Sequence, residues 1–170
     1  MNSTATLHSL GFSNLRTYFA TALFVIGNIV LPQLFHLFPH GGMIWLPIYF
    51  FTLVGAYKYG WRVGLMTAIL SPTISSMAFG MPIVAFLPAI ILKSSLLAIA
   101  ARLAANYFHK ATIQTLLLVV LAYQIVGTLG EWAIVGNLSA ALQDFRIGVP
   151  GMLLQVFGGW WVINRINIIK

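Results

Sequence analysis

An uncharged apolar stretch near the N-terminus constrains the fold most strongly. Residues 17–38 contain no Asp, Glu, Lys or Arg, and about 17–25 apolar residues in a helix are long enough to cross a bilayer. The whole chain has the same character, since 60% of its 170 residues are hydrophobic and 6% are charged, against about 25% charged in a soluble domain. A soluble domain of this size has too little interior to bury so much apolar surface. The sequence therefore predicts an integral, all-α membrane protein with a single domain over residues 1–170.

Hydropathy divides this domain into six transmembrane helices separated by short turns. Residues 1–14 are expected to form a short cytoplasmic lead-in, because they lack the basic start and short apolar run of a cleaved signal peptide. The spans are predicted at 17–38, 43–57, 63–77, 82–101, 111–130 and 147–164.

The placement of charge predicts the orientation of these spans. Lysine and arginine collect in cytoplasmic segments of membrane proteins, so a chain with both termini inside places seven basic residues there: Arg16, Lys58, Arg62, Arg102, Lys110, Arg165 and Lys170. The outer connections then hold Arg146 and both acidic residues, Glu131 and Asp144. Together with the absence of cysteine, this predicts a multi-pass protein of the bacterial inner membrane.

The net charge of +7 does not indicate a nucleic-acid partner. The basic residues lie between apolar runs, where membrane topology explains them, and they form no basic stripe on a nucleic-acid-binding fold. The expected surroundings of the chain are therefore a lipid bilayer.

Lys93 is the most unusual residue of the predicted spans. Counted from Pro82, it lies about 16 Å into the fourth span, where a charge costs at least about 2.5–3.5 kcal/mol and commonly marks a functional site. Two interpretations follow. Lys93 faces a ligand cavity, which is preferred, or it pairs with Glu131 to hold helices together. The second needs a tilted or broken helix, because Glu131 is predicted nearer the outer surface.

Polar residues at mid-depth on other spans support a cavity. Asn28 and Gln124 join Lys93 there, and lipid does not tolerate such groups. On the outer side, Gly and Pro permit irregular backbone where it lines a cavity, and aromatic residues with a few polar groups are typical of a pocket for an organic molecule. Ordinary outer loops are the alternative. The candidate binding residues are His36, His40, Trp45, Ser76, Met77, Phe79, Met81, Lys93, Gln124, Glu131, Asn137, Asp144 and Arg146.

Motifs for catalysis are absent from the sequence. It contains no HExxH, no GxSxG and no phosphate-binding glycine loop. His36 and His40 have metal-ligand spacing, but Pro39 interrupts a helix between them. We therefore expect a protein that is not an enzyme and has no cofactor or metal site of its own.

Two segments carry a resemblance to a known family. They are "LPIYFFTLVGAYKYGWRVGLMTAILSPTISSMAFGMP" at 46–82 and "GVPGMLLQVFGG" at 148–159, and with them the chain resembles the substrate-binding S components of energy-coupling factor (ECF) vitamin transporters. The resemblance implies a six-helix bundle with both termini inside, an outward-facing pocket closed by the first, third and fifth loops, and no catalytic activity. It also implies a transmembrane scaffold and two ATPase subunits as partners.

The resemblance leaves the partner and the ligand open. The Ala-xxx-Ala docking pattern of the first helix is missing, because the residue four positions after Ala20 is Phe24 and the residue four positions after Ala22 is Ile26. The chain is therefore expected to work with an ECF module or alone. A basic Lys93 and Arg146 suit a carboxylate vitamin such as biotin or pantothenate. The Met- and aromatic-rich outer wall favours cobalamin or another corrinoid slightly, with His36 or His40 as a possible axial ligand. The alternative function is a structural or assembly subunit that binds no small ligand.

Overall fold

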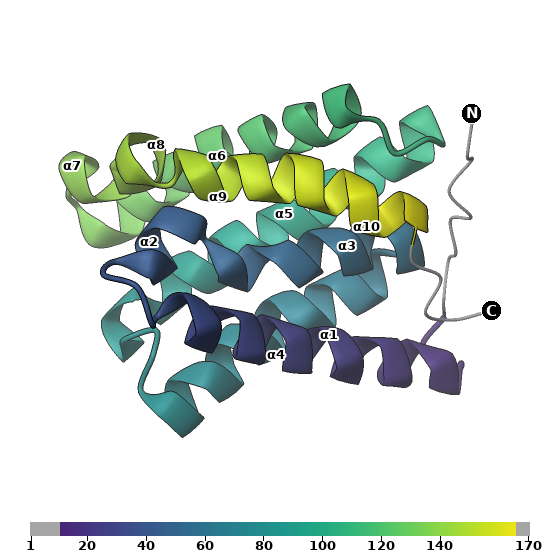
Figure 1. Ribbon diagram of the computed structural model, residues 1–170, viewed down its shortest axis with the longest axis horizontal. Helices are drawn as coiled ribbons and strands as arrows, with labels where there is room; N and C mark the ends of the chain where they lie inside the picture. The colour runs from purple at the N-terminus through teal and green to yellow at the C-terminus, as the bar shows by residue number, and fades with distance from the viewer. Residues whose placement is uncertain (1–10, 166–170) are drawn as a thin grey trace.

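Six helical rods run side by side along the long axis of the bundle (Figure 1). The computed structural model describes residues 11–165, and every regular element among them is helical. Lys170 and most of the predicted lead-in lie outside these residues. The rods are α1 (Leu15–Phe35), η1 with α3 (Pro47–Tyr49, Phe50–Tyr59), α4 (Trp61–Phe79), η2 with α5 (Val84–Phe86, Leu87–Phe108), α6 (Ile113–Val135), and α9 with η3 and α10 (Val149–Leu153, Leu154–Gly158, Gly159–Arg165). Short helices α2 (Gly41–Trp45), α7 (Leu138–Ala141) and α8 (Gln143–Ile147) lie in the connections.

The connections between the rods alternate between two ends of the bundle. At one end, on the right in Figure 1, α1 begins, α10 ends, and the turns from α3 to α4 and from α5 to α6 are found. We call this the basic end, since Arg16, Lys58, Arg62, Arg102, Lys110 and Arg165 lie at or near it. The opposite end carries α2, α7 and α8 (Figure 1). Glu131, Asp144 and Arg146 are at this opposite end.

The short helix α3 occupies the centre of the bundle. It contacts α1, α4, α5, η3 and α10, and all of its residues except Phe51 are buried. Its Lys58 is 2% exposed and donates from Nζ to the carbonyl oxygen of Ile163 at 2.7 Å. This bond ties the centre of the bundle to its last rod.

One glycine sets the sharp turn between α3 and α4. Gly60 has φ 109°, a backbone conformation that a residue with a β-carbon rarely adopts. The turn lets α4 fold back directly against α3, and the two helices share an extended contact.

A hydrogen-bonded network joins four of the rods at mid-length. The Nδ2 group of Asn28 donates to the hydroxyl oxygens of Thr52, at 3.0 Å, and Ser71, at 3.3 Å, while Asn28 Oδ1 accepts from the backbone N–H of Phe51 at 3.0 Å. Thr52 Oγ1 lies 3.3 Å from Ser94 Oγ. The mid-depth asparagine, which was expected to indicate a cavity, therefore has protein partners on α3 and α4.

The outside of the bundle is apolar. On α6, the exposed large side chains are hydrophobic apart from Gln114 near its start: Ile113, Leu117, Leu118, Leu121, Ile125, Val126, Leu129, Trp132 and Ile134. The same helix directs Gln124 and Thr128 inward, where they are buried. An apolar exterior around a partly polar interior is the arrangement expected in lipid. Among the described residues, three segments are long and apolar enough to cross a membrane: Leu15–Phe35, Val84–Phe108 and Ile113–Val135. The chain is thus an all-α protein with membrane-spanning character.

The second predicted span differs in form from the prediction. Residues 43–57 were expected to form one helix, but the chain breaks at Leu46, which has φ 45°, before Pro47 starts η1. Proline lacks an N–H and disfavours helical backbone in the residue before it. From η1 through α3 the rod has 13 residues and is about 20 Å long. It is shorter than an ordinary transmembrane helix.

Candidate functional site

Three charged side chains meet near the end of the bundle opposite the basic end. The Nζ atom of Lys93 on α5 forms ion pairs with Glu131 Oε2 on α6 and, at 2.7 Å, with Asp144 Oδ2 on α8. The Lys93 side chain is 3% exposed, and the two carboxylates are 16% and 17% exposed. We call these three residues the charge cluster. It contains both acidic residues of the chain.

The boundaries of the two helices that carry Lys93 and Glu131 differ from those predicted. Helix α5 begins at Leu87, because the chain after Pro82 first forms the extended Ile83 and the short η2. Counted from Val84, where the rod of η2 and α5 begins, Lys93 is about 14 Å along it, close to the predicted value of about 16 Å. Glu131, which was predicted in a polar connection, belongs to the last turns of α6. The two side chains form their ion pair while both helices stay unbroken.

Close packing of α5 on α6 gives the lysine its route to the carboxylate. A β-carbon added at Gly127 would lie 2.7 Å from Lys93 Cγ, so the lysine stem runs across the surface that the glycine leaves bare. Gly127 is one turn before Glu131, and side chains on a helix lean toward the preceding turn. The Glu131 carboxylate and the Lys93 ammonium therefore meet beside Gly127.

The charge balance of the cluster is negative. One ammonium faces two carboxylates, so the three groups carry a formal charge of −1. Lys93 contacts one oxygen of each carboxylate, which leaves the second oxygen of each for another partner. Such an environment repels a further anion. Lys93 is thus poorly suited to bind the carboxylate of a ligand directly.

Buried polar groups continue from the cluster along one face of α6. Gln124 is fully buried, and neither its amide nitrogen nor its amide oxygen has a hydrogen-bond partner among the described residues. The hydroxyl of Thr128, one turn further along, is also buried without a partner within residues 11–165. Such groups cost about 1–3 kcal/mol each when left unsatisfied. They are therefore candidates for contact with a bound species.

A second pair of polar side chains links α6 to the π-helical segment η3. The hydroxyl of Tyr123 donates to Gln155 Oε1 at 2.9 Å, and both residues are buried. The Tyr49 ring lies 5.7 Å from that of Tyr123. Single-turn π segments often occur at functional sites, and here the segment contributes Gln155 to the interior.

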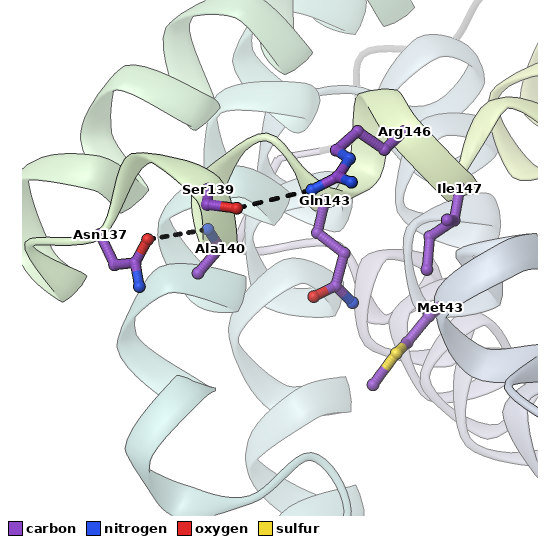
Figure 2. A pocket seen from close by; sticks show the side chains of 7 residues that line it. All are labelled: Met43, Asn137, Ser139, Ala140, Gln143, Arg146 and Ile147. Carbon is purple, nitrogen blue, oxygen red and sulfur yellow. Dashed lines mark hydrogen bonds between the residues drawn. The ribbon is translucent and has the colours of Figure 1, made fainter.

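A separate hollow opens over the connection between α6 and α9. It has a volume of about 500 Å³ and is lined by Met43, Asn137, Ser139, Ala140, Gln143, Arg146 and Ile147 (Figure 2). Arg146 Nη1 lies 3.5 Å from Ser139 Oγ, and Asn137 Oδ1 accepts from the backbone N–H of Ala140 at 3.2 Å. The hollow thus combines a cation, two amides and apolar side chains.

Helix α8 stands between the hollow and the charge cluster. Its residues Gln143, Arg146 and Ile147 line the hollow, whereas Asp144 pairs with Lys93. A helix of five residues therefore carries one face of the hollow and one member of the cluster.

The remaining predicted site residues lie outside both groups. His36 and His40 are exposed at the corner between α1 and α2, and α1 already ends at Phe35. Trp45 stacks on Phe35, with ring centroids 5.3 Å apart. At the end of α4, Ser76 is buried, while Met77, Phe79 and Met81 are 84%, 54% and 48% exposed. The structure thus brings together Lys93, Glu131 and Asp144, and separately Asn137 with Arg146.

Several residues of the site were not singled out from the sequence. Asp144 was named as a binding residue but not as a partner of Lys93, and Thr128, Met43 and Ser139 were not named as site residues. A count of charges could have found the first, because a chain with one intramembrane lysine and only two acids has few ways to pair that lysine. The residues lining the hollow depend on the path of the connection and carry no sequence pattern.

Comparison of the chain with protein-family models, with curated proteins and with solved structures found no match.

Proposed function

We propose that this chain is the ligand-binding membrane subunit of an importer for a vitamin or a related micronutrient, as its resemblance to ECF S components implies. The observation that carries the proposal is the hollow beside α8. Its volume of about 500 Å³ falls within the range of about 300–1,000 Å³ that is usual for small-molecule sites. Its lining of Arg146, Asn137, Gln143 and Met43 offers both polar and apolar contacts.

The proposal includes a membrane topology. All six rods cross the bilayer of the bacterial inner membrane, with the basic end in the cytoplasm and the hollow on the outer side. The distribution of basic residues supports this orientation. The short central rod of η1 and α3 is surrounded by the other rods and needs no full lipid-facing length.

The charges of the site favour a ligand whose acidic group contacts Arg146. The Arg146 guanidinium lines the open hollow, and arginine binds carboxylates through paired N–H donors. Lys93, in contrast, is already enclosed by Glu131 and Asp144. A compact carboxylate vitamin such as biotin or pantothenate suits this arrangement. A corrinoid, which the sequence favoured slightly, is larger and would be enclosed only in part.

The chain works with an ECF scaffold and its ATPase subunits or alone. The missing Ala-xxx-Ala pattern leaves both modes open. The face of α1 with Phe19, Leu23, Ile26 and Val30 is exposed and apolar, so it offers large side chains rather than a flat alanine surface.

A structural or assembly subunit is the competing function. The pairing of Lys93 with both carboxylates favours it, because a buried lysine held in this way joins α5, α6 and α8 without any ligand. The hollow beside α8 has no role under this alternative.

Thermal unfolding of the purified protein separates the two functions. A ligand that binds the folded state alone must raise its melting temperature, so we expect stabilisation by one member of a panel of B vitamins and corrinoids. Arg146→Gln should weaken that stabilisation, whereas Lys110→Gln, an equal charge change at the basic end, should not. A flat response to the whole panel would favour the structural subunit.

A further inference from the structure

We propose that the inner face of α6 binds a monovalent alkali-metal cation next to the charge cluster. The ligands are the carboxylate of Glu131, the hydroxyl of Thr128 and the amide oxygen of Gln124. This site is independent of the hollow and of any vitamin. Three observations carry it: the charge of the cluster, the unpartnered oxygens, and their spacing on one helix.

The first observation is the surplus negative charge. Lys93 neutralises only one of the two carboxylates, so the cluster keeps a formal charge of −1 although its side chains are largely buried. A buried charge without compensation is strongly unfavourable. One monovalent cation makes the group neutral, whereas a divalent cation would reverse its sign. The charge balance therefore selects a single positive charge.

The second observation is the presence of unpartnered oxygens about one and two turns before Glu131 on the same helix. Gln124 Oε1 and Thr128 Oγ1 are buried and have no hydrogen-bond partner within the described part of the chain. Lys93 contacts Oε2 of Glu131, so Oε1 of this carboxylate can take another partner. Carboxylate, amide and hydroxyl oxygens are the ligands that hard cations prefer.

The third observation is the spacing of the three residues. Gln124, Thr128 and Glu131 are at positions i, i+4 and i+7 of α6, which places them within an arc of about 60° on one helix face. Thr128 stands between the other two. The longer side chains of Gln124 and Glu131, about one turn to either side, can therefore reach an ion beside the Thr128 hydroxyl.

The three ligand residues lie on a helix that is long and apolar enough to cross a membrane, and this also supports the proposal. Among the described residues, α6 is one of three segments with the length and composition of a membrane span. Acidic and polar groups inside such helices commonly mark ion sites and ion pathways. A bound ion would supply the partner that the buried oxygens of Gln124 and Thr128 lack.

The test compares melting temperatures of the purified protein in sodium, potassium and choline chloride at equal ionic strength. Choline is too large for an enclosed site and controls for screening. A cation at about ten times its dissociation constant should raise the melting temperature by about 3–6 °C above the choline value. The sodium and potassium arms show which ion the site takes.

Variants locate the site on α6. Thr128→Val and Gln124→Leu should each remove most of the cation-dependent shift, while remaining folded in choline because each deletes an unsatisfied polar group. Gln114→Leu, on the same helix but exposed near its start, should keep the full shift. Equal melting temperatures in all three salts, or a shift that survives both site variants, would overturn the proposal. A melting temperature that rises at lower pH but does not respond to sodium or potassium would also overturn the proposal, because it would show that a proton neutralises the cluster.

Discussion

The aliphatic stem of Lys93 lies against Gly127, so closely that a β-carbon at this glycine would be 2.7 Å from Lys93 Cγ. The contact explains how a lysine on α5 reaches a glutamate on α6 while both helices stay unbroken. It also makes the charge cluster sensitive to an uncharged residue that takes part in no ion pair.

Gly127→Ala should therefore lower stability. The added methyl group would press on the middle of the lysine stem, which cannot move without displacing the ammonium from its carboxylates. Overpacking of this kind costs about 1–3 kcal/mol. Gly130→Ala is the matched control, since its β-carbon would meet the terminal Cδ2 of Leu92, which can rotate away. Thermal or denaturant unfolding should show the larger loss for Gly127→Ala, and equal losses would contradict the tight passage of Lys93.

Removal of the Lys93 charge should be strongly destabilising. Lys93→Met keeps the volume of the stem but leaves Glu131 and Asp144 facing each other without a cation. Breaking a buried ion pair costs about 3–5 kcal/mol. Because the two carboxylates are partly exposed, we expect a loss of stability near the lower value. The triple variant Lys93→Met/Glu131→Gln/Asp144→Asn should recover much of the loss. Lys110→Met, at an exposed position of the basic end, should change little. A stable Lys93→Met protein would mean that the carboxylates do not depend on the lysine.

The network around Asn28 predicts a third loss of stability. Asn28→Leu would leave the backbone N–H of Phe51 without its acceptor and would remove the donor to Thr52 and Ser71. A stranded buried donor costs about 1–3 kcal/mol. Asn106→Leu, an exposed position on α5, tests the general effect of replacing an asparagine by leucine. The unfolding midpoints of the two variants should differ clearly.

The six-span topology can be tested by labelling single cysteines, because the chain has none of its own. Cysteine at His40 or Asn137, both exposed at the end opposite the basic end, should react with an impermeant thiol reagent added outside intact cells. Cysteine at Ser13 or His109, exposed at the basic end, should react only after the membrane is opened. A mixed pattern within either pair would show that the number of spans is not six.

Hydropathy and charge predicted the all-α character of the chain and the position of its long apolar helices. They could not place the ends of those helices where polar and apolar signals compete. Glu131 looked like the start of a connection, because a single acid ends a hydropathy window, yet α6 continues through it to Val135. The helix tolerates the acid because Lys93 on a neighbouring helix compensates its charge.

The start of the helix that carries Lys93 was also difficult to predict from hydropathy. Pro82 was taken as the start of the fourth span, but the helix starts at Leu87 with Pro88 in its first turn. Residues 82–86 therefore precede α5, and Val84–Phe86 among them form η2. Contacts between distant segments, such as the ion pair of Lys93 on α5 with Asp144 on α8, depend on the paths of the connections. Those paths cannot be predicted from periodicity or composition.

The hydrogen bond from Lys58 to the carbonyl of Ile163 joins residues 105 positions apart and has a consequence for biogenesis. At ribosomal speeds of about 5–20 residues per second, the acceptor is synthesised about 5–20 s after the lysine. During that interval α3 has been synthesised, but the carbonyl that accepts the hydrogen bond from its lysine does not yet exist. Final seating of α3 must therefore follow the arrival of the last rod, so that assembly of this protein is completed after translation of its C-terminal part rather than helix by helix.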